Sequence, residues 1–185
     1  MTHFEFVTVA VSMVYALSIA RCLDAMPFAF DRDRRYWIHF TWLCVKLANP
    51  AVLWWSLWGL NEAGTLPFSS FLALLIIPGT LYLQVIALVT TNPSDITDWK
   101  THYYARRMLF FGTNIFLLFM LLLAGHFLYA TPSPIPIKLT QILTIILSGI
   151  AMISQNEKLH ACIAILAALN MFVMAFALAV TAYVS

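Results

Sequence analysis

Apolar stretches about as long as a lipid bilayer is thick recur six times along this chain and leave little sequence between them. The hydrocarbon core of a bilayer is about 30 Å thick, so a helix needs roughly 20 apolar residues to cross it. The stretches that reach or approach this length are residues 4–22, 36–60, 68–90, 108–130, 137–154 and 161–184. We therefore predict an all-α, polytopic membrane helix bundle with six transmembrane helices, forming a single transmembrane domain over residues 1–185.

The composition excludes an ordinary soluble domain. Hydrophobic residues make up 62% of the chain and charged residues 10%, whereas soluble domains have roughly 45–50% and about 25%. The net charge is only +2 and the basic residues form no tail, so a nucleic-acid partner is not expected. The expected surroundings of the chain are those of a lipid bilayer.

Basic residues are concentrated in alternate connections between the predicted helices. The first, third and fifth connections together hold Arg32, Arg34, Arg35, Lys100, Arg106, Arg107 and Lys158, which are seven of the ten basic residues. Short loops rich in Lys and Arg stay in the cytoplasm. We therefore predict that both termini lie on the non-cytoplasmic side. The bacterial inner membrane is the expected location, because the compact chain carries no organelle address.

Lys46 is the most unusual residue of the predicted bundle. It follows Tyr36, at the start of the second predicted helix, by about 15 Å at 1.5 Å per residue, which places it near the middle of the bilayer. A charged lysine at that depth costs about 2.5–3.5 kcal/mol on insertion scales, so it should face the bundle interior or water. The sequence therefore predicts a polar intramembrane pathway around Lys46. The structural alternative is a lysine held by buried amides or carbonyl groups.

Further polar residues accompany Lys46 at helical spacing. The same face of the second predicted helix carries His39 and Asn49. Candidates for the polar interior from the other helices are Glu5, Ser12, Tyr15, Gln84, Asn114, Gln141 and Asn170. Together they predict a hydrated centre. The alternative is that such side chains only join neighbouring membrane helices.

The third connection is the most polar part of the chain. Its candidate residues are Asp98, His102, Arg106 and Arg107. An aspartate just before a helix accepts hydrogen bonds from the first free backbone N–H groups, so capping of the fourth helix and mutual pairing are expected here. A gate or a site for lipid head groups is the functional alternative.

No cofactor and no metal site is predicted. The histidines contain no pair at i, i+4 and no H-E-x-x-H, and the cysteines show no C-x-x-C spacing. Haem between two histidines would need His39 and His160 at one depth on facing helices. G-x-S-x-G and P-loop motifs are also missing from the sequence, so an enzyme is disfavoured.

These observations favour a small channel or transporter for a small ion or solute, which we expect to form a homo-oligomer because one bundle of this size is small for a pore. A structural or accessory subunit of a membrane complex is the first alternative. This alternative predicts that the polar side chains form hydrogen bonds with one another or face a partner protein. A membrane-embedded redox or lipid-modifying enzyme is the second alternative.

Overall fold

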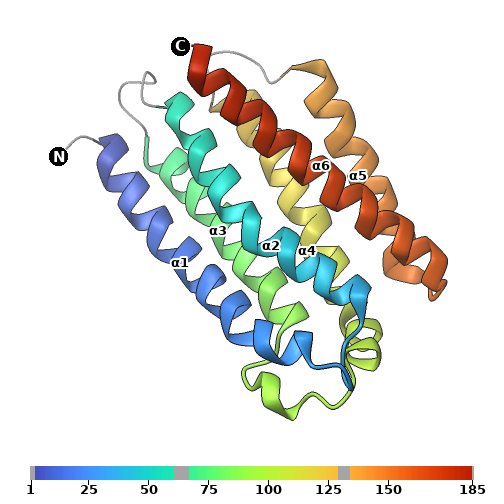
Figure 1. Cartoon of the computed structure of the whole chain (residues 1–185). Coiled ribbons are helices and arrows are strands. Elements are labelled where there is room, and N and C mark those ends of the chain that lie inside the picture. The colour runs from blue at the N-terminus through green and yellow to red at the C-terminus, as the bar shows by residue number, and fades with distance from the viewer. Residues whose placement is uncertain (1–2, 61–66, 129–133, 185) are drawn as a thin grey trace.

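A computed structural model describes residues 3–60, 67–128 and 134–184, and over these residues the chain is all-helical, with no β-strand. The six α-helices are α1 (His3–Phe30), α2 (Trp37–Ser56), α3 (Phe68–Leu88), α4 (Trp99–Phe127), α5 (Ile135–Ile153) and α6 (Glu157–Val184) (Figure 1). Two short 3-10 helices, η1 (Leu57–Leu60) and η2 (Pro93–Asp95), follow α2 and α3. The predicted connections at 61–67 and 131–136 and the predicted helix end at 129–130 lie mostly outside the described residues. The all-α class is confirmed.

Three helices extend further than their apolar stretches predicted. Helix α1 continues to Phe30, α4 begins at Trp99 and α6 begins at Glu157. The added turns mix charged and aromatic residues, so they lack the continuous apolarity of a membrane-crossing segment. They nevertheless contain few helix breakers and remain helical where the chain leaves the bilayer.

Five of the helices that the structure describes, namely α1, α3, α4, α5 and α6, are long and apolar enough to cross a membrane. Many of their large apolar side chains are exposed, as expected where lipid is the solvent. The chain is therefore a multi-pass membrane protein. Helix α2 falls outside this group because it carries His39, Lys46 and Asn49 within 20 residues.

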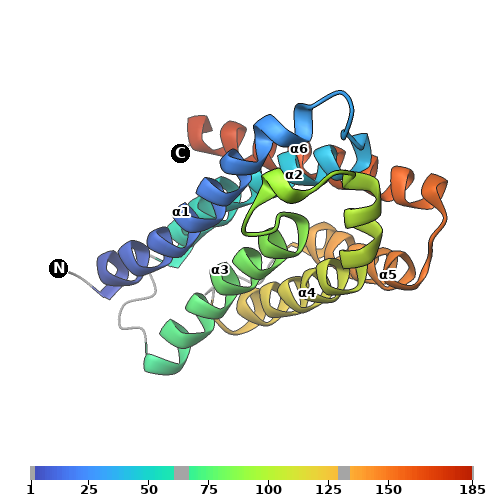
Figure 2. The ribbon, with the colours of Figure 1, turned by 90° about the horizontal axis from the view of Figure 1, so that it is seen from below.

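The helices form two layers of neighbours around a shared interior. Helix α1 packs on α2 and α3, α3 packs on α4, and α4 packs on α5, while α6 lies mainly on α2 (Figures 1 and 2). The start of α1 and the end of α6 lie at the same end of the bundle (Figure 1). We call this the terminal end, and we call the opposite end, with connections 31–36, 89–98 and 154–156, the loop end.

The loop end contains the larger and more aromatic part of the core. Trp42, Trp99, Tyr103, Phe110 and Phe111 are each at most 2% exposed and belong to one cluster. The terminal end has a smaller, mostly aliphatic cluster built from α1, η1, α3 and α4. The bundle is therefore packed most tightly near the loop end.

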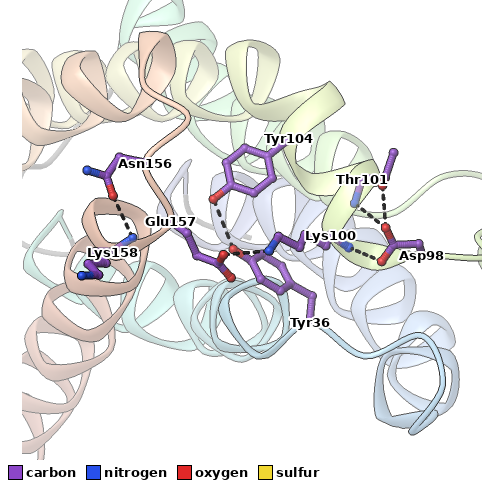
Figure 3. Close-up of polar contacts among 8 residues, drawn as sticks. All are labelled: Tyr36, Asp98, Lys100, Thr101, Tyr104, Asn156, Glu157 and Lys158. Carbon is purple, nitrogen blue, oxygen red and sulfur yellow. Dashed lines mark hydrogen bonds and ion pairs between the residues drawn. The ribbon is translucent and has the colours of Figure 1, made fainter.

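Polar contacts join separate helices at the loop end (Figure 3). Lys100 of α4 forms an ion pair with Glu157 of α6, with 2.7 Å between Nζ and Oε2. Next to this pair, the hydroxyl oxygens of Tyr36 and Tyr104 are 3.2 Å apart. Deeper in the bundle, the Tyr103 hydroxyl lies 2.9 Å from Nδ1 of His160. The ion pair and the Tyr103–His160 contact link α4 to α6 where both helices begin, and the tyrosine pair links α4 to the start of α2.

Asp98 is the N-cap of α4. Its carboxylate accepts hydrogen bonds from the backbone N–H groups of Lys100 and Thr101, each at 3.0 Å. The hydroxyl of Thr101 donates a further bond to it and, with these N–H groups, lowers the pKa of the Asp98 carboxyl. Because its pKa is lower in the folded state, the Asp98 carboxylate stabilises the fold at pH values above its unfolded-state pKa. This contribution is lost as the pH falls through the folded-state pKa.

We expect Asp98→Ala to reduce the free energy of unfolding by about 1 kcal/mol at pH 7, since an alanine N-cap leaves these donors unpaired. The difference from wild type should shrink in acid, when the carboxylate is protonated. Thermal unfolding of purified protein at pH 7 and at a series of pH values below 3.8, the ordinary pKa of an aspartate, measures both effects. Asp24→Ala is the matched control, because exposed Asp24 makes no side-chain hydrogen bond within the described residues. An equal loss in the two variants would contradict the capping role.

Candidate site around a buried lysine

Lys46 lies inside the bundle and is only 2% exposed. Its Nζ donates a hydrogen bond to Oδ1 of Asn114 on α4, at 3.0 Å. Asn114 Nδ2 in turn donates to the hydroxyl of Ser148 on α5, also at 3.0 Å. This chain of hydrogen bonds joins α2, α4 and α5 and fixes the position of the ammonium group.

Aromatic rings flank Lys46 and separate it from the loop end. Its Nζ lies 5.6 Å from the centre of the Trp42 ring and 5.5 Å from that of Phe110. Trp42 packs edge-to-face on both Phe110 and Phe111, at 5.0 and 5.7 Å between ring centres. A cation within about 6 Å of an aromatic face is attracted to it. The rings thus stabilise the charge and close the interior on the loop side.

On the other side of Lys46 the interior is hollow. A cavity of about 250 Å³ is lined by Lys46, Trp42 and Asn49 of α2 and by residues of α4, α5 and α6. A second cavity of about 440 Å³ extends to Ser56, Gly125 and Pro134 at the terminal end. Both cavities are lined by Asn49, Asn114, Leu118, Thr140, Thr144, Asn170 and Met171. They therefore adjoin, and we call the two together, which extend from the terminal end to Lys46, the connected cavity.

Amide side chains from α2, α4, α5 and α6 line this connected cavity. Asn49, Gln141 and Asn170 line it from α2, α5 and α6, and none of the three makes a side-chain hydrogen bond within the described residues. Buried or half-buried amides normally have partners. These three are therefore positioned to bind a guest or water.

The structure gathers only part of the predicted polar interior. Lys46, Asn49, Asn114, Gln141 and Asn170 line the connected cavity, and Tyr15 contributes to its wall from α1. Four other candidates, Glu5, Ser12, His39 and Gln84, do not line it.

Three of these four, Glu5, Ser12 and Gln84, have different environments. Glu5 is exposed in the first turn of α1. The Ser12 hydroxyl accepts a 2.8 Å hydrogen bond from Nε1 of Trp54. Gln84 is fully buried in α3, and neither of its side-chain polar atoms has a partner in the described part of the chain.

The histidines and the polar loop residues mainly organise the loop end. Nε2 of His39 and Nε2 of His102 lie 3.0 and 3.1 Å from the carbonyl oxygen of Leu88, the last residue of α3. His160, which was considered as a haem partner of His39, instead contacts Tyr103 and the carbonyl oxygen of Ser154. Within the described residues no group of three or more His, Cys, Asp or Glu side chains is arranged to hold a metal ion.

The predicted mutual pairing within the third connection is not seen for its two arginines. Arg107 donates to the carbonyl oxygen of Tyr104 at 2.7 Å, and Arg106 is exposed. The sequence reasoning also did not assign the aromatic closure by Phe110 and Phe111. Both residues belong to an uninterrupted apolar stretch, and nothing in such a stretch distinguishes a ring beside a lysine from one facing lipid.

Comparison with known proteins adds no relative: no protein-family model, curated protein or solved structure matches this chain.

Proposed function

We propose that this chain is a small membrane transporter or channel, which moves a small ion or solute through the cavity that ends at Lys46. The observation that supports this most directly is the connected cavity from the terminal end to a buried lysine. Charged side chains within a membrane are costly and commonly mark ion or substrate pathways. The cavity gives Lys46 a route to the outside of the bundle.

The aromatic closure favours a carrier over an open pore. Trp42, Phe110 and Phe111 are fully buried between Lys46 and the loop end, so the cavity is closed on the loop side. A carrier binds its solute in such a one-sided site and then exposes it to the other side. An open channel would need a passage through these rings.

The unpaired amides argue against an accessory subunit with a purely structural interior. In such a subunit, the polar side chains should satisfy one another or face a partner. Asn49, Gln141 and Asn170 instead line a cavity and have no hydrogen-bond partner within the described residues. An interior built for packing alone would hold leucine at these positions without cost.

The proposal includes a topology. Helix α2 would be the sixth span, because it runs alongside the five apolar helices and its polar residues face inward. The basic loop end would lie in the cytoplasm and both termini outside, in agreement with the distribution of Lys and Arg. The expected location remains the bacterial inner membrane, and a homo-oligomer remains a prediction, although the cavity lies within one chain.

We expect Lys46→Met to abolish solute movement. Methionine fills a similar volume without the charge, and the loss of stability should be limited to about 1–3 kcal/mol, because Asn114 Oδ1 loses its donor. Purified protein in liposomes would be tested for uptake of radiolabelled chloride, sodium and acetate. Wild type should move at least one of them faster than protein-free vesicles, and Lys46→Met should reduce that rate at least tenfold. Lys158→Met removes an exposed lysine and should have no effect. Equal rates in wild type and Lys46→Met, or no uptake by wild type, would contradict the proposal.

A further inference from the structure

We propose that the connected cavity binds a small monocarboxylate with an apolar tail, whose carboxylate meets Lys46 and whose tail extends toward the terminal end. This inference rests on the proposed transport function and adds the class of substrate. It is based on the charge of the site, its free hydrogen-bonding groups and the chemistry of its walls.

The charge of the cavity fits one negative charge. Among the described residues, Lys46 is the only charged side chain that lines either cavity, and no carboxylate lines them. A charge buried in a membrane needs a partner of opposite sign. A monovalent anion neutralises the lysine, whereas a cation would meet an uncompensated positive charge and a dianion would leave one charge unpaired.

The hydrogen-bonding groups fit a carboxylate. An ammonium group has three donors, and within the described residues Lys46 uses one of them, on Asn114. Asn49 and Asn170 line the same inner cavity and have amide donors with no partner in the described part of the chain. A carboxylate has about four acceptor positions, so it can accept bonds from the lysine and both amides at once.

The walls fit an apolar tail. From the amides outward, the cavity is lined mainly by aliphatic side chains and methionines, among them Leu118, Leu121, Met171 and Met174. Methionine is flexible and adapts to guests of different shape. A cavity of about 440 Å³ lies within the usual range for small-molecule sites, and an inorganic anion would leave most of its apolar wall in contact with nothing.

The two sides of the cavity belong to helices that are packed on different neighbours. Ile137 and Thr144 line it from α5, which packs mainly on α4, while Met171 and Met174 line it from α6, which lies mainly on α2. In Figure 1, α5 and α6 converge at the loop end and spread apart toward the terminal end. A tail lying between them would point from Lys46 toward the terminal end.

Binding of radiolabelled octanoate to the full chain in lipid nanodiscs tests the assignment. Equilibrium dialysis, with empty nanodiscs subtracted, should give saturable binding to wild type and to the Lys158→Met control. Lys46→Met should weaken binding at least tenfold. The double variant Asn49→Ala/Asn170→Ala keeps the Lys46–Asn114 contact and should weaken it several-fold, which covers the case of a Lys46→Met protein that fails to fold.

Competition by compounds with the same tail identifies the head group. Unlabelled octanoate should displace the probe, whereas 1-octanol, octyl phosphate and octyltrimethylammonium should be at least tenfold less effective. Equal displacement by any of these three, binding that does not saturate, or binding unchanged by Lys46→Met would overturn the assignment. Octanoate binding without any flux in liposomes would contradict the transport proposal alone, and flux of another solute without octanoate binding would contradict the substrate class alone.

Discussion

Replacing Asn114 with leucine is expected to lower the free energy of unfolding by about 2 kcal/mol, because it leaves the Lys46 ammonium without its hydrogen-bond acceptor. A hydrogen bond to a charged group contributes more to stability than one between neutral groups. A buried charge that loses its partner keeps the full cost of its removal from water. The leucine also removes the donor that Asn114 provides to Ser148. Thermal unfolding of purified Asn114→Leu protein measures the loss.

Two further variants make this prediction specific. Asn170→Leu replaces an amide of the same cavity that has no partner within the described residues, so it should be neutral or slightly stabilising. The double variant Lys46→Met/Asn114→Leu removes both ends of the hydrogen bond and should be more stable than Asn114→Leu alone, since apolar groups then replace both polar partners. A double variant that is less stable than Asn114→Leu would show that the contact with Lys46 is not the cause.

Replacing Trp42 with alanine should have the largest effect on the closure of the interior. Trp42 is 2% exposed and packs edge-to-face on Phe110 and Phe111. Removing a buried tryptophan side chain costs about 3–5 kcal/mol. The space left would adjoin the cavity at Lys46, because Trp42 forms part of its lining. We therefore expect both a lower unfolding temperature and a several-fold faster passive leak of chloride from liposomes.

The control for this leak lies on the same helix. Trp37 is 48% exposed at the start of α2, so Trp37→Ala should change neither the stability nor the leak by much. Trp42→Phe should lie between wild type and Trp42→Ala, since it retains a ring against Phe110. If Trp37→Ala and Trp42→Ala leak equally, general damage to the bundle explains the result and the closure is not formed by Trp42.

The sequence located the helices better than it located their ends. Apolarity identifies the part of a helix that lipid surrounds, so all six helices were found from their apolar stretches. Apolarity does not show where the backbone hydrogen bonds of the helix begin and end. The segment from Trp99 to Arg107 carries three charged side chains and one histidine, which resembles a loop, yet Asp98 caps it and the helix starts there.

The candidate site was predicted in part for a similar reason. Helical spacing shows which side chains share a face, but it does not show which neighbour that face meets. The stripe of Lys46 and Asn49 turns toward α4, α5 and α6 and lines the cavity. The stripe on α1 turns elsewhere, and its Ser12 accepts a hydrogen bond from Trp54 of α2. Only the packing of the helices separates these two outcomes.

The contacts between α4 and α6 at the loop end determine where a second opening could form. The ion pair between Lys100 and Glu157 and the contact between Tyr103 and His160 both link these helices, close to the three-residue connection from α5 to α6. That connection joins α5 and α6, which line two sides of the cavity, at the loop end. In the proposed carrier cycle, widening the loop end between α4 and α6 would require both contacts to break. The energy of one exposed ion pair and one buried hydrogen bond would then be part of the barrier between its two orientations.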